Sequence, residues 1–114
     1  MNYISELSQE KLVELISDDN LSVETEEVVF NSVMRWLDHD ADAHSVDFHR
    51  VLENVRLPLL SPYFLHDCVE QQRSVMEGDE CQKLLHEAKT YHLLADRRAE
   101  LRSPRTRPRK ASCR

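Results

Sequence analysis

Hydrophobic residues recur every three or four positions along most of the chain, which is the spacing of one face of an α-helix. The first such segment includes Leu12 and Ile16 and predicts a helix over residues 9–17. Ser8 is its expected N-cap, because a serine hydroxyl accepts a hydrogen bond from an amide of the first turn. The Asp-Asp-Asn run at residues 18–20 favours a turn, because these short polar side chains bond to nearby backbone groups.

A second helix is predicted to follow Thr25, its expected N-cap. Glu26 and Glu27 suit the first turn, because the amino end of a helix carries a partial positive charge. One stripe of this helix is apolar and is expected to face the core. It consists of Val29, Val33, Trp36 and Leu37.

A third helix is predicted with Ser45 as its cap and an apolar face that repeats with helical spacing. This face consists of Phe48, Val51, Leu52 and Val55.

Two prolines divide the apolar stretch "VRLPLLSPYFL", residues 55–65. Pro58 is expected to leave Leu57 extended and to end the third helix, because proline lacks an N–H group and disfavours a helical conformation in the preceding residue. Pro62 follows Ser61, which predicts a capped start of a fourth helix over "SPYFLHDCVE". The connector should lie against the core, because its leucines are too apolar for an exposed loop.

Gly78 and Asp79 mark a turn before a fifth helix, "ECQKLLHEAKTYHLL". Beyond residue 94 we expect one more helical turn, and then an extended, solvated tail imposed by Pro104 and Pro108. The expected fold is all-α, an array of about five antiparallel helices with an extended basic C-terminal tail. The stripe of the fifth helix consists of Cys81, Leu84, Leu85, Ala88, Tyr91 and His92.

Composition excludes several classes of protein. Gly78 is the only glycine of the 114 residues, so the chain cannot build a glycine-rich phosphate loop. Apolar runs are too short to cross a bilayer and no signal peptide is apparent, so we expect a soluble, non-secreted, cytoplasmic protein, with the nucleus left open. Cys68, Cys81 and Cys113 are odd in number and form no Cys-x-x-Cys pair, which argues for a reducing compartment and against a disulfide framework or zinc knuckle.

Charge divides the chain near residue 94. Residues 1–94 hold 19 acidic and 7 basic side chains, whereas residues 95–114 hold 2 acidic and 8 basic ones. The net charges of −12 and +6 predict different roles for the two parts.

Four separated blocks carry a resemblance to a known family: "NLSVETEEVVFNSVMRW", "VRLPLLSPYFL", "CQKLLHEAKTYHLL" and "RSPRTRPRK". In this order and spacing they resemble the BACK domain of Kelch-like (BTB-BACK-Kelch) proteins, over about residues 5–110. The resemblance implies a helical segment of a substrate adaptor for a cullin-3 ubiquitin ligase, in which a BTB domain dimerises and recruits cullin-3 and a Kelch propeller binds substrates. Ala95 departs from the proline that usually follows the "HLL" block in this family.

The resemblance also implies a domain organisation. Residues 1–7 are a lead-in, residues 8–102 the helical domain, and residues 103–114 a basic linker toward a Kelch propeller. The 3-box helices that complete the cullin-binding groove are expected to be missing from this chain, so cullin-3 should bind it weakly or not at all. The motif residues are Trp36, Val55, Arg56, Leu57, Pro58, Leu59, Leu60, Pro62, Tyr91, His92, Leu93 and Leu94.

Candidate chemistry is weak throughout, and we expect neither enzymatic activity nor a cofactor. His39, Asp40, Asp42 and His44 could suggest a metal site, but a helix would not place all four on one face, and a solvated connector is favoured. In "HEAKTYH" the second histidine is six positions from the first, not the four of a metalloprotease helix. Cys68, Cys81, Trp36 and His92 are expected to serve packing or helix-end hydrogen bonding.

The basic tail allows a second interpretation, as a nucleic-acid contact or nuclear import signal. It has no aromatic residue for base stacking, and the acidic body would repel a polyanion, so a linker is favoured. The resemblance implies that its arginines pair with carboxylates of the preceding helices. For the whole protein the alternative to a ligase adaptor is a ligase-independent, actin-associated scaffold, which this segment alone does not separate.

Overall fold

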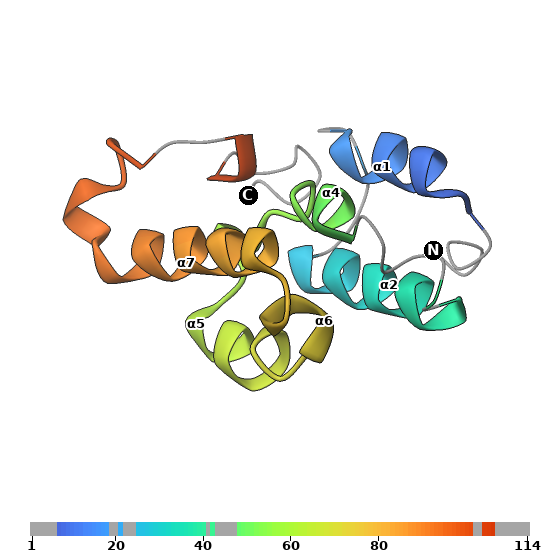
Figure 1. The fold of residues 1–114 in the computed structure, drawn as a ribbon. Helices are drawn as coiled ribbons and strands as arrows, with labels where there is room; N and C mark the ends of the chain where they lie inside the picture. The colour runs from blue at the N-terminus through green and yellow to red at the C-terminus, as the bar shows by residue number, and fades with distance from the viewer. Residues whose placement is uncertain are drawn as a thin grey trace.

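The computed structural model describes residues 7–18, 21, 25–40, 42, 48–101 and 104–106. Within these residues the secondary structure is helical and contains no strand, which confirms the all-α prediction. Three helices form one side of the arrangement in Figure 1: α4 (Phe48–Leu52) packs against α1 (Gln9–Ser17) and α2 (Glu26–His39). The other face of α4 meets α7 (Asp79–Leu93), so this short helix joins the two ends of the domain.

The first two helices begin where the sequence predicts, and α1 also ends there. The Ser8 hydroxyl accepts a hydrogen bond from the Lys11 amide at 3.3 Å, so it caps α1 as expected. The Leu21 amide donates to the Asp18 carbonyl at 3.1 Å, which forms the expected turn after α1. Thr25 occupies the N-cap position of α2, but its side chain makes no capping hydrogen bond.

The third helix is shorter than predicted, and its expected cap, Ser45, lies outside the described residues. α4 ends at Leu52, and the chain continues in tighter turns in which the Val55 amide donates to the Leu52 carbonyl at 2.9 Å. The Asn54 side chain donates to the Arg50 carbonyl at 2.8 Å, the acceptor that a continuing α-helix would use for the Asn54 amide. Val55 is nevertheless buried, as its apolar spacing predicted.

The prediction that Pro58 ends the third helix and leaves Leu57 extended is wrong, because α4 already ends at Leu52 and Pro58 lies inside a further helical turn. Leu57 begins a 3₁₀ turn, η2 (Leu57–Leu59), in which the Leu59 and Leu60 amides donate to the Arg56 and Leu57 carbonyls. A 3₁₀ turn suits the position because proline has no amide hydrogen to donate and needs no partner near the start of the turn.

The fourth helix starts as predicted and then widens. The Ser61 hydroxyl accepts a hydrogen bond from the Phe64 amide at 3.1 Å, with Pro62 at the first position of α5 (Pro62–Phe64). From there the chain continues as a π-helix, η3 (Leu65–Val69), in which the Glu70 amide donates to the Leu65 carbonyl. A short helix that the sequence did not predict, α6 (Arg73–Met76), then leads to α7.

The end of the described chain forms two short turns. η4 (Ala95–Arg97) is the additional helical turn predicted after α7. At η5 (Pro104–Thr106) the prediction of an extended, solvated tail is wrong, because this segment is a 3₁₀ turn that packs against η2. The rest of the predicted tail, including Pro108, lies outside the described residues. Arg105 and Thr106 are only partly exposed.

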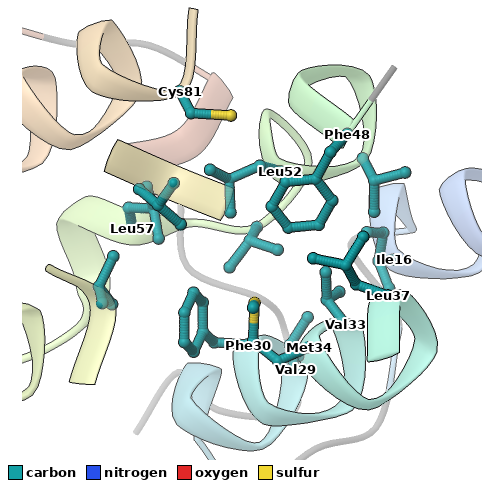
Figure 2. Close-up of a cluster of buried hydrophobic side chains, with 14 of the residues drawn as sticks. Ile16, Val29, Phe30, Val33, Met34, Leu37, Phe48, Leu52, Leu57 and Cys81 are labelled. Carbon is teal, nitrogen blue, oxygen red and sulfur yellow. The ribbon is translucent and has the colours of Figure 1, made fainter. Parts of the chain in front are cut away.

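The hydrophobic core draws side chains from α1, α2, α4, the connector, η3, α6 and α7. Figure 2 shows Ile16 of α1 and Phe48 of α4 beside Val33 and Leu37 of α2, with Leu57 facing Phe30. All four residues of the stripe predicted for α2 are buried, and Trp36 is 0% exposed. On α7 the predicted stripe is buried only at Cys81, Leu85 and Ala88, while Leu84, Tyr91 and His92 are partly exposed.

Candidate functional site

The connector, residues 56–60, is the segment where distant parts of the chain meet. Leu57, Pro58 and Leu60 are buried and Leu59 is partly buried, which confirms that the connector lies against the core. Both α7 and η5 pack against it. The middle of the chain is therefore enclosed by the last long helix and by the segment that follows it.

A buried carboxylate fixes the start of the connector. The Arg56 amide donates to Oε2 of Glu26, the first residue of α2, at 3.2 Å. Both residues are buried, so this bond forms away from water, where leaving the amide unpaired would destabilise the fold. Glu26 thus ties the connector to the amino end of α2.

A histidine fixes the end of the connector. Nε2 of His92 lies 2.7 Å from the Leu60 carbonyl oxygen. A carbonyl oxygen only accepts hydrogen bonds, so Nε2 must carry the proton and donate it. His92 belongs to the last turn of α7, as the sequence predicted for a histidine that bonds at a helix end. The connector is consequently held by side chains from both long helices.

A shallow groove of about 320 Å³ lies between the fourth helix and α7. Its apolar wall includes Pro62, Leu65 and Leu93, and an ion pair between Glu70 and Lys89 spans it. The hydrogen bond from Lys89 lowers the pKa of Glu70 below its ordinary value. The ion pair therefore joins η3 to α7 across the groove.

The far side of α7 holds the chain that follows it. Glu87 accepts two hydrogen bonds from the Arg105 guanidinium, at 2.7 Å from Nε and 2.9 Å from Nη2. Arg98 lies over the Tyr91 ring, with Cζ 4.7 Å from the ring centroid, and its Nε donates to the Tyr91 carbonyl at 3.1 Å. The pairing of tail arginines with helix carboxylates, expected from the family resemblance, is present at Arg105.

The structure brings most of the predicted motif residues together. Residues 55–60 and the last turn of α7 meet directly through His92. Trp36 lies apart from this junction, fully buried, with Nε1 donating to the Leu7 carbonyl at 2.7 Å. Leu93 and Leu94 belong to the surface, since Leu93 is 81% exposed and Leu94 is 43% exposed.

Within the described part of the chain, the cysteine and histidine residues considered as candidates for chemistry lie in packed or exposed helical positions. Burial raises the pKa of the Cys81 thiol to about 11, which keeps it protonated at neutral pH. His39 is the last residue of α2 rather than part of a connector, and Asp42 is helical and exposed, while His44 lies outside the described residues. Across the residues that the structure describes, no group of three or more histidine, cysteine or acidic side chains is placed to hold a metal ion.

No helix in the described part of the chain is both long enough and apolar enough to cross a membrane. The fold and the junction define a helical packing module in which the central connector, the two long helices and the final turn are joined by specific hydrogen bonds.

Comparison with known proteins identifies the module. The family model of the BACK domain, "BTB And C-terminal Kelch", matches residues 2–70, and the chain belongs to this family. The chain is 40% identical to human Kelch-like protein 5 over 106 residues, which is 93% of the chain and 14% of that protein. It is 41% identical to rat Kelch-like protein 24 over 107 residues, 94% of the chain and 17% of the relative. The chain therefore spans about a sixth of the length of these relatives.

Sequence reasoning missed the charged residues that make the junction. The sequence predicted only that Glu26 suits the positive end of α2. In the structure its carboxylate also accepts a hydrogen bond from the Arg56 amide. Glu87, Lys89 and Glu70 carried no signal, because a single charged side chain on a helix surface is ordinary. The family resemblance implied pairs between tail arginines and helix carboxylates, but it did not name Glu87 as the partner of Arg105.

Proposed function

We propose that this chain is the spacer segment of a substrate adaptor for a cullin-3 RING ubiquitin ligase in the cytoplasm. In this role it holds a Kelch substrate-binding domain at a set distance and angle from a BTB domain. The observation that carries the proposal is the buried connector, which Glu26 of α2 and His92 of α7 hold from opposite ends. Because both long helices are bonded to the same connector, they cannot shift independently. Such a segment keeps the domains at its two ends at a fixed distance and angle.

Membership of the BACK family supports the adaptor role, since the chain is about 40% identical to Kelch-like proteins over nearly its full length. In the whole protein, the Kelch domain would bind substrates and the BTB domain would dimerise. The BTB domain and the 3-box together would bind cullin-3.

Calorimetry against an amino-terminal cullin-3 fragment tests the adaptor role. Residues 1–114 alone should bind weakly or not at all, whereas the chain joined to a BTB domain and 3-box should bind tightly. A fragment that keeps one wall of a groove loses most of the central contacts yet still bears the entropy cost of association. Tight binding by the short chain would contradict this placement of the site, and absence of binding by the long chain would favour the ligase-independent scaffold.

Spin-label distances test the spacer role in the chain itself. Nitroxides at Glu14→Cys and Leu93→Cys, two exposed positions on α1 and α7, should give one narrow distance distribution. The parent for this experiment has its three native cysteines replaced. Adding Leu60→Ala should broaden the distribution, because the connector loses its packing. A broad distribution already present in the parent would contradict a stiff spacer.

A further inference from the structure

The ion pair between Arg105 and Glu87 differs from the charge pairs that lie within single helices. It joins η5 to α7 across 18 positions of sequence, with two parallel hydrogen bonds of 2.7 and 2.9 Å. Its side chains are 23% and 29% exposed. Partial burial and two-pronged geometry both strengthen a guanidinium–carboxylate pair relative to an exposed single contact.

The pairs within single helices show the contrast. Lys83 and Glu80 are neighbours on α7 at 3.6 Å, with side chains 74% and 60% exposed. Arg73 and Glu77 are similarly exposed at 3.4 Å. Exposed pairs of this kind contribute little, because water and salt screen them and both side chains lose rotational freedom.

The surroundings of Arg105 also involve more than one element. The hydrogen bonds that Arg105 donates to Glu87 raise the pKa of Arg105, and the nearby charge of Glu53, just after α4, acts in the same direction. Its own segment packs against the buried connector. Arg105 therefore sits among α7, the end of α4 and η2.

We propose that the Arg105–Glu87 pair is a latch that fastens η5 to α7, and so sets the position and direction of the chain at Thr106. The inference rests on the proposed spacer function, because a spacer controls orientation only if its exit is held. A domain attached after Thr106 would be oriented from this point rather than from a free tether.

Trypsin digestion of the 114-residue chain tests the latch, because trypsin cleaves the Arg105–Thr106 bond only when the segment opens. Glu87→Gln keeps the side-chain shape and removes the charge, so cleavage at Arg105 should become about tenfold faster. Glu80→Gln is the matched control on the same helix, and its cleavage rate should equal that of the parent. Mass spectrometry measures the rate at each bond.

Trypsin cleavage at a second, buried site distinguishes opening of the latch from destabilisation of the whole domain. Arg56 is buried in the connector, so its bond reports opening of the whole domain. A selective increase at Arg105 supports the latch, and an equal increase at Arg56 overturns it. An unchanged rate at Arg105 in Glu87→Gln also overturns it.

A charge exchange gives a second measurement that does not depend on trypsin. The heteronuclear NOE of the Thr106 amide should fall in Arg105→Glu and recover in the double variant Glu87→Arg with Arg105→Glu, which restores an opposite-charge pair. Absence of any fall in the single variant contradicts the latch. These readouts come from the chain alone, so failure of cullin binding by the longer protein would leave the latch standing, and failure of the latch would leave the cullin result standing.

Discussion

Helices α2 and α7 are nearly equal in length but are used in different ways. Eight of the 14 residues of α2 are buried, whereas only three of the 15 residues of α7 are. α2 packs against α4, is joined to the connector through Glu26, and supplies the largest buried side chains, Trp36 and Phe30. α7 covers one side of the core and uses its partly exposed surface for the polar contacts made by Glu87, Lys89 and His92.

The difference indicates a division of labour within one small domain. Burial of apolar area is the dominant source of stability, so α2 should determine whether the domain folds. Hydrogen bonds and ion pairs are directional but contribute less net free energy, so α7 should determine how the connector and the exit of the chain are oriented.

The largest expected effect is from Trp36→Ala in α2, which should destabilise the domain by about 3–5 kcal/mol through the cavity left behind. Leu93→Ala in α7 is the control and should change stability by less than about 0.5 kcal/mol, because this side chain is 81% exposed. Chemical denaturation followed by circular dichroism measures both. Equal losses in the two variants would contradict the division between the helices.

The connector is expected to behave like α2, although it has no long helix of its own. Leu60→Ala should cost about 2–4 kcal/mol, because Leu60 is 1% exposed and packed on all sides. Tyr63→Ala, three residues on and 81% exposed, is the comparison that should leave the unfolding midpoint nearly unchanged. A midpoint in Leu60→Ala that matched the parent would show that the connector does not depend on burial.

Cys81 is the buried ionisable group on α7 and should make stability depend on pH. Its pKa is raised from 9.0 to about 11 in the folded state, so its contribution is complete below pH 9 and is lost as the pH rises toward 11. The loss should be on the order of 2 kcal/mol at pH 11.

Cys81→Ala is the control for that prediction, because tyrosine and lysine residues also titrate in this range. The difference in unfolding free energy between the parent and Cys81→Ala should narrow between pH 9 and pH 11. A constant difference would contradict the raised pKa. The alkylation rate at pH 8 gives an independent check, since Cys68 is partly exposed and should react faster than Cys81.

The smallest effects concern the helix caps. Ser61→Ala should cost about 1 kcal/mol, because its hydroxyl accepts the Phe64 amide and holds the start of the fourth helix. Thr25→Ala at the start of α2 should cost only a few tenths of a kcal/mol, because Thr25 makes no capping hydrogen bond. Thermal denaturation of the two variants compares their losses of stability. A larger loss in Thr25→Ala than in Ser61→Ala would contradict this prediction.

Local patterns in the sequence predicted the parts of the fold that depend on local physics. The spacing of apolar residues located α1, α2 and α7, and Ser8 and Ser61 were recognised as caps because the hydroxyl bonds within its own turn. Pro62 marked the start of the fourth helix, because the fixed φ of proline suits the first helical position. The apolar connector was predicted to be buried for the same reason that any run of leucines avoids water.

The tertiary structure alone decided which polar groups meet. Glu26 and Arg56 are 30 positions apart, and His92 and Leu60 are 32 apart, so no spacing rule could pair them. The packed turn at Arg105 likewise depends on neighbours from other elements. Helix formation is governed by interactions within a few residues, whereas the partners of a charged or polar side chain are set only when packing brings distant segments into contact.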